Sequence, residues 1–148
     1  MKVFILLLLV TVFIFSFSPT AYNYVAPFEY LDLTGFKIAG LILGHLSLAG
    51  IIIAQVQMKQ SWRIGIDYEN KTNLVTSGLF SKTRNPIYLF LLFSLIGLFL
   101  ILPNAVTFAV LFAAYLVLHI TMRLEEDFLS KQHGQAYLSY KSKVARLI

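Results

Sequence analysis

The chain has 148 residues, of which 58% are hydrophobic and 13% are charged, and its mean hydropathy is +0.76. Soluble domains carry about 25% charged residues, so this composition argues against a soluble domain and indicates a small membrane protein with a single domain over 1–148. Cysteine is absent and the formal charge is +5, which excludes disulfides, thiolate nucleophiles and Cys-based metal sites and leaves a basic surface to explain.

Four apolar stretches are predicted to be membrane-spanning helices, at 3–17, 36–56, 87–102 and 105–120. Each is close to the ~17–25 residues that a spanning helix needs, although the first and third are short. An alternative for the first stretch is a cleaved signal peptide, because one lysine precedes the apolar run and turn residues follow it. No small-x-small cleavage site is visible there, and the other three spans do not depend on this choice.

The distribution of basic residues predicts the topology. The segments 57–86 and 121–148 hold ten of the twelve lysines and arginines, whereas 18–35 has acidic residues and neither Lys nor Arg. By the positive-inside rule the two basic segments are cytoplasmic, and Lys2 places the N-terminus on the same side. Pro103 and Asn104 then form a tight outer turn. The predicted fold class is an all-α integral membrane protein with about four transmembrane helices and both termini cytoplasmic.

The tail after Met122 is predicted to be an amphipathic helix on the membrane surface. Apolar residues recur at helical spacing from Leu124 to Leu129, Gly134 interrupts the pattern, and tyrosines resume it. Lysines and arginines on the other side suit a helix that lies on an anionic leaflet. Membrane lipids therefore account for the positive charge, and nucleic acid is not needed as a partner.

A polar, basic segment precedes the third span and reads Leu-Val-Thr-Ser-Gly-Leu-Phe-Ser-Lys-Thr-Arg-Asn-Pro-Ile-Tyr over 74–88. Gly78 permits a positive φ, and Pro86 suits the first turn of a helix. Arg84 and Asn85 lie beside that helix N-terminus, whose N–H groups attract anions. A cytoplasmic loop followed by a Pro-started helix is the alternative, and it explains Arg84 and Pro86 but not the whole string.

A second charged segment follows the fourth span and reads Arg-Leu-Glu-Glu-Asp over 123–127. Acidic residues at a helix C-terminus oppose the macrodipole at a cost of about 0.3–1 kcal/mol each. The three carboxylates therefore require a cationic partner, which Arg63, Arg84 or Arg123 could supply. A ligand with a sulfonium or ammonium group is the alternative, and both readings stay open on the sequence.

Histidines give a weaker signal. His45 lies in the middle of a span, where it is either a functional residue or a neutral side chain bonded to a neighbouring helix. No two histidines have metal-ligand spacing, and no metalloprotease, serine-nucleophile or phosphate-loop motif is present. A metal site is not predicted.

These motifs together resemble the isoprenylcysteine carboxyl methyltransferase family. The string over 74–88 is followed by Arg-x-Glu-Glu-Asp-x-Leu and then by His-Gly-x-x-Tyr-x-x-Tyr, so the likeness covers about residues 60–146. That family shares its C-terminal region with membrane phospholipid methyltransferases. The resemblance implies an integral membrane methyltransferase that uses S-adenosylmethionine.

The resemblance also implies roles for particular residues. Those expected to bind the cofactor are Thr72, Asn73, Leu74, Val75, Phe80, Asn85, Pro86, Ile87, Tyr88 and Glu125. Those expected to be catalytic are Arg123 and Glu126. The chain departs from the family where Asn85 replaces the usual histidine, and Arg123 only loosely matches the family's substrate-side arginine. An asparagine still donates and accepts hydrogen bonds.

The expected acceptor is a lipophilic small molecule or a prenylated group, methylated on a carboxylate at the cytoplasmic side. A carboxylate is already ionised near neutral pH, so the reaction needs alignment more than a base. An amine acceptor, as in phospholipid N-methylation, would have to lose a proton to Glu125, Glu126 or His119. A non-catalytic membrane binding protein and a nicotinamide-dependent membrane reductase are further alternatives. Oligomeric state is left open.

Overall fold

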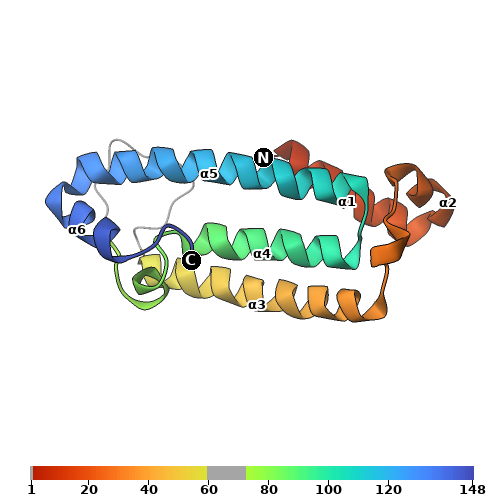
Figure 1. Ribbon diagram of the computed structural model, residues 1–148, viewed down its shortest axis with the longest axis horizontal. Coiled ribbons are helices and arrows are strands. Elements are labelled where there is room, and N and C mark those ends of the chain that lie inside the picture. The colour runs from red at the N-terminus through yellow and green to blue at the C-terminus, as the bar shows by residue number, and fades with distance from the viewer. Residues whose placement is uncertain (1, 60–72) are drawn as a thin grey trace. The chain divides into compact units, whose positions relative to one another are not determined.

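The computed structural model describes residues 2–59 and 73–148, and every regular element in these residues is helical (Figure 1). The longer helices are α1 (Lys2–Phe17), α3 (Thr34–Met58), α4 (Pro86–Ile101), α5 (Ala105–His133) and α6 (Gln135–Lys143). The short elements are α2 (Pro19–Tyr22), η1 (Asn23–Val25), η2 (Glu29–Leu31) and η4 (Gly78–Ser81). The predicted helical fold is therefore confirmed for the described residues.

Two of the helices, α3 and α5, are long and apolar enough to cross a membrane, and α4 and Leu6–Phe17 of α1 are shorter apolar helices. Large apolar side chains along α3 and α5 are exposed, including Leu46 at 64% and Phe112 at 57%. Extended apolar surface of this kind needs a lipid or protein environment. The four helices coincide with the predicted spans, while their orientation in a membrane stays a prediction.

Helix α5 continues well beyond the predicted end of the fourth span at residue 120. It runs without a break to His133 and ends at Gly134, which has a φ of +54°. The residues after 120 are mostly good helix formers, so the change from apolar to polar composition does not stop the helix. The predicted tail helix is therefore two pieces, the polar end of α5 and the separate helix α6.

The chain divides into two compact units. Unit 1 comprises Met1–Ser47 and Leu92–Leu116, and unit 2 comprises Leu48–Leu91 and Val117–Ile148. Helices α3, α4 and α5 each contribute one part to each unit.

In unit 1 a tight turn joins α4 to α5, as the Pro103-Asn104 pair predicts. Asn104 is fully buried, and its Oδ1 accepts hydrogen bonds of 3.0 Å from the amides of Val106 and Thr107. This is an N-cap of α5. The Phe28 amide donates to the Pro103 carbonyl oxygen at 2.7 Å, which ties the segment before α3 to the same turn.

Helices α3 and α4 approach closely in unit 1 through two glycines. A Cβ added to Gly40 would lie 2.5 Å from the Gly97 carbonyl oxygen, and one added to Gly97 would lie 2.8 Å from the Gly40 carbonyl oxygen. Small residues at such crossings let two backbones touch, which is a common way of packing apolar helices.

Candidate functional site

The two motifs predicted to converge do meet in unit 2. The Tyr88 hydroxyl, in the first turn of α4, donates a short hydrogen bond to Glu125 Oε1 on α5. Both side chains are partly buried. The segment 78–88 and the acidic segment 123–127 therefore share one location, and one oxygen of Glu125 is held in a defined position.

Glu126, the next residue on α5, lies at the centre of an ion-pair cluster. It is 2% exposed, and Arg146 Nε and Nη2 donate to its two oxygens at 2.8 and 2.9 Å. Arg84 Nη2 lies 3.3 Å from Oε1, and Lys141 Nζ lies 3.4 Å from Oε2. The internal salt-bridge reading of the acidic segment is thus confirmed for Glu126, with Arg84 as one of its partners.

The C-terminal tail returns to the start of α4, where the C-terminus is marked in Figure 1. The Arg146 carbonyl oxygen accepts hydrogen bonds from Asn85 Nδ2 at 3.0 Å and from Thr83 Oγ1 at 3.1 Å, and the Ala145 carbonyl oxygen accepts one from the Arg84 amide at 2.9 Å. Asn85, predicted to bind the cofactor, therefore also fastens the tail.

The segment before α4 is anchored to the end of α3. Gly78 has a φ of +64°, as its position in the motif predicts, and Gln57 Oε1 accepts a hydrogen bond from the Leu79 amide at 2.9 Å. A Cβ on Gly78 would lie 2.5 Å from the Gln57 amide group. Phe80 follows with 7% exposure, and its carbonyl oxygen accepts a 2.5 Å hydrogen bond from the Tyr140 hydroxyl of α6.

The remaining predicted site residues have varied surroundings. Leu74, Val75 and Ile87 are partly buried, Pro86 is buried, and Asn73 and Arg123 are exposed. Thr72 and Arg63 lie outside the described residues. Lys141 and Arg146 are not predictable from the sequence as partners of the acidic segment, because no local pattern links them to Glu126. Tyr137 and Tyr140, in the His-Gly-x-x-Tyr-x-x-Tyr string, were the available signal that this tail belongs to the site.

Three side chains of the tail near Glu126, those of Tyr137, Tyr140 and Arg146, have raised pKa values. Burial, together with the charge on Glu126, raises the pKa of Tyr137 to about 12, and burial raises the pKa of Tyr140 to about 12. The hydrogen bond from Arg146 to Glu126 raises the pKa of the Arg146 guanidinium. Both phenols are therefore neutral and Arg146 is cationic near neutral pH.

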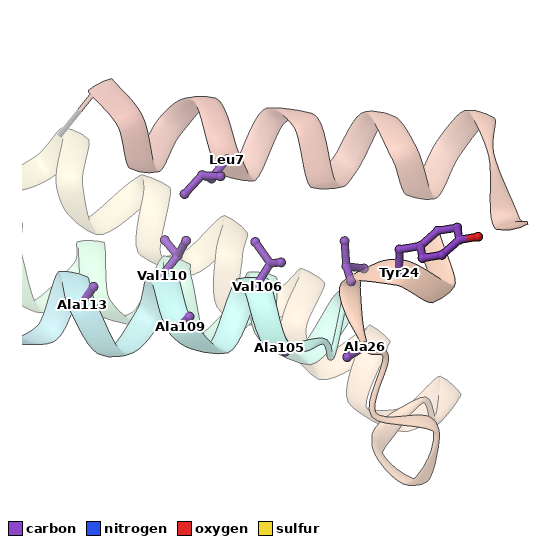
Figure 2. Close-up of a pocket in the computed structure, with 9 residues that line it drawn as sticks. Leu7, Tyr24, Ala26, Ala105, Val106, Ala109, Val110 and Ala113 are labelled. Atoms are coloured by element: carbon purple, nitrogen blue, oxygen red, sulfur yellow. The ribbon is translucent and has the colours of Figure 1, made fainter. Parts of the chain in front are cut away.

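A separate cavity of about 480 Å³ lies in unit 1 (Figure 2). In the figure Leu7 of α1 projects toward the side of α5 that carries Val106, Ala109 and Val110. The residues that line it are Leu7, Tyr24, Val25, Ala26, Ala105, Val106, Ala109, Val110 and Ala113. This lining has no charged side chain, so the cavity does not suit a donor with ionic groups.

The described residues thus form a helical protein with two helices long and apolar enough to cross a membrane and a polar, charged site at the start of α4 in unit 2. The sequence profile of the phospholipid methyltransferase family matches residues 36–136, which is more than half of the chain, and the chain belongs to this family. The match includes Tyr88, Glu125 and Glu126. No curated protein matched the chain in sequence. The protein is thus a member of a membrane methyltransferase family.

Proposed function

We propose that the protein transfers a methyl group from S-adenosylmethionine to the headgroup of a lipid-like or prenylated acceptor. The hydrogen bond between Tyr88 and Glu125 is the observation that carries this proposal, because it joins the two motifs expected to hold the donor. The family match over residues 36–136 supports the same reaction class. The basic segments 57–86 and 121–148 support the proposal that the site lies on the cytoplasmic side.

Glu125 is the proposed partner of the donor's positive charge. Its carboxylate is partly buried, and Tyr88 holds Oε1, so the group has a set orientation. A partly buried carboxylate attracts a sulfonium or ammonium group more strongly than one in bulk water. Residues of the segment before α4 and of its first turn are proposed to complete the donor site, namely Thr72, Asn73, Leu74, Val75, Phe80, Asn85, Pro86 and Ile87.

When bound, the donor supplies a methyl carbon on a positively charged sulfur. The methyl group would pass to an acceptor oxygen or nitrogen, with the electron pair of the former carbon–sulfur bond left on the donor's sulfur. The protein's part is to align the two reactants and exclude water. Gln57 binds the segment before α4, and Glu126 binds the C-terminal tail. Both contacts fix the backbone near the start of α4, which would help to align the reactants.

Two acceptor chemistries have support. The resemblance over 60–146 favours a carboxylate, for which no base is needed, and exposed Arg123 is proposed to contact it. The family match is consistent with a phospholipid amine, whose proton is proposed to pass to Glu125. Glu126, proposed from the sequence to be catalytic, has both oxygens in ion pairs, which supports a role in positioning the tail and not in proton transfer.

Calorimetric titration of S-adenosylmethionine, which carries both the sulfonium and the ammonium charge, into the full-length protein in detergent tests the donor site. Glu125→Gln is expected to weaken binding about 10-fold or more, since a charge-assisted contact contributes about 1.5–3 kcal/mol. Asp127→Asn is the matched control, because this neighbouring carboxylate is exposed. If Glu125→Gln binds like the unchanged protein, the assignment of the donor site is wrong.

A labelled methyl donor separates the acceptor chemistries. The protein is incubated with a prenylcysteine analogue in one reaction and with phosphatidylethanolamine vesicles in another. A methyl ester releases labelled methanol in mild alkali, whereas a methylated amine keeps its label. Incorporation into neither acceptor class would reject both proposals on the acceptor.

A further inference from the structure

Arg84 carries hydrogen-bond donors for which the described part of the chain supplies no partner. Its side chain is 8% exposed, and Nη2 lies beside Glu126. Arg84 also has a side-chain hydrogen-bond contact with Tyr137, and both Nε and Nη1 are buried without a hydrogen-bond partner among the described residues. Buried polar groups are nearly always satisfied, and a cationic donor is the most costly to leave unpaired. The two nitrogens therefore require acceptors from outside the described residues.

The charges around Arg84 indicate that the missing acceptor is an anion. Arg84, Lys141 and Arg146 contact the single carboxylate of Glu126, so the contacting groups have an excess of two positive charges. Asp127 reduces this excess only partly, because it acts on Arg146 from an exposed position. Arg84 also lies two residues before Pro86, the first residue of the 16-residue helix α4, whose dipole favours negative charge at this end.

We propose that Arg84 binds the phosphate group of a lipid headgroup through Nε and Nη1. Guanidinium and phosphate groups are well matched in geometry and charge. The methyl donor is a poorer fit, because its sulfonium and ammonium outweigh its one carboxylate and leave a net positive charge. Arg84 contacts Glu126 on α5, and the preceding residue, Glu125, accepts the hydrogen bond from Tyr88. The lipid site would thus adjoin the donor site, and this part of the inference rests on the proposed function.

Titration with short-chain lipids tests the site on the full-length protein in detergent. The probes are dihexanoyl phosphatidic acid and dihexanoylglycerol, which differ in the phosphate. The unchanged protein is expected to bind only the first. Arg84→Lys keeps a cation beside Glu126 but loses the planar donors, and should bind phosphatidic acid about 10-fold more weakly. Lys82→Gln removes an exposed charge two residues away and should change the affinity less than twofold.

S-adenosylhomocysteine binding identifies the source of the anion. Arg84→Lys should bind it like the unchanged protein. If this variant instead loses S-adenosylhomocysteine and keeps phosphatidic acid, the lipid assignment is overturned and the donor's carboxylate is the ligand. If it keeps both, water satisfies Nε and Nη1 and the proposal is wrong. If the unchanged protein binds no S-adenosylhomocysteine, the methyltransferase proposal fails, while the lipid titration still decides the phosphate site.

Thermal unfolding of the unchanged protein keeps the test independent of how the variants fold. Phosphatidic acid should raise the unfolding midpoint and dihexanoylglycerol should not, because a ligand that binds the folded state stabilises it. Equal midpoints with the two lipids overturn the proposal, even where Arg84→Lys and a second variant, Arg84→Gln, fail to fold.

Discussion

Arg146 holds Glu126 with two hydrogen bonds, one to each carboxylate oxygen, at 2.8 and 2.9 Å. This pair joins the third residue from the C-terminus to helix α5. The backbone carbonyl oxygen of Arg146 accepts a hydrogen bond from the side chain of Asn85, just before α4. One residue of the tail therefore connects both of the segments that the sequence motifs single out.

Glu126→Gln is expected to destabilise the protein by about 3 kcal/mol, because it leaves the cation of buried Arg84 uncompensated. The partly exposed Lys141 and Arg146 should add little. Unfolding in denaturant measures the loss. Asp127→Asn, an exposed neighbour, should change the free energy of unfolding by no more than about 0.5 kcal/mol. Equal stabilities of the two variants would show that the cluster does not hold the fold together.

Tyr140→Phe removes the donor to the buried Phe80 carbonyl oxygen. A buried acceptor left unpaired costs about 1–3 kcal/mol, so the free energy of unfolding should fall by that amount. Tyr30→Phe is the control, because Tyr30 is 76% exposed and should tolerate the change. A neutral result for Tyr140→Phe would mean that the tail does not anchor this segment.

Alkaline pH should weaken the attachment of the tail. Burial raises the pKa of Tyr137 and Tyr140 to about 12, from 10.0, so the folded state favours the neutral phenols. This contribution to stability is complete below pH 10 and is lost as the pH rises from 10 to about 12. The pH dependence of the unfolding midpoint measures it. Replacing either tyrosine with phenylalanine should flatten the dependence, and an unchanged slope would contradict the prediction.

Gly78→Ala should disturb the segment before α4. It forces a Cβ onto a residue with a φ of +64°, and that Cβ would lie 2.5 Å from the Gln57 amide group. The strain alone costs about 1–2 kcal/mol, and S-adenosylhomocysteine should bind more weakly as the segment shifts. Ser77→Ala, at an exposed position with no side-chain cap, should bind normally. Matching affinities would remove this segment from the proposed donor site.

Gly40→Ala should loosen the crossing of α3 and α4 in unit 1. Its Cβ would lie 2.5 Å from a backbone oxygen of Gly97, so the helices must separate. A loss of about 1–3 kcal/mol is expected from overpacking, measured as unfolding in detergent. Gly44→Ala, one turn further along α3, has open space around its Cβ and should be neutral or stabilising. If Gly44→Ala destabilised the protein more than Gly40→Ala, the close contact of α3 and α4 at Gly40 and Gly97 would be wrong.

Local chemistry made several features predictable. The positive φ at Gly78, the turn at Asn104 and the Pro86 start of α4 follow from the conformational preferences of single residues. The uninterrupted path of α5 to His133 is not predictable in the same way, because the change from apolar to polar composition marks the end of an apolar span and not the end of the helix. Polar residues such as Arg, Glu, Lys and Gln, which are common after residue 120, have about the same helix propensity as Leu and Met.

By itself, the sequence determined the helical composition, the apolar stretches and the two motifs of the candidate site, because periodicity and backbone preference act between near neighbours in the chain. Only the tertiary structure decided which cations reach Glu126, that Tyr88 meets Glu125, and that two buried donors of Arg84 have no partner among the described residues. Such pairings depend on where distant segments come together, and a carboxylate attracts any cation within reach, whatever its position in the sequence.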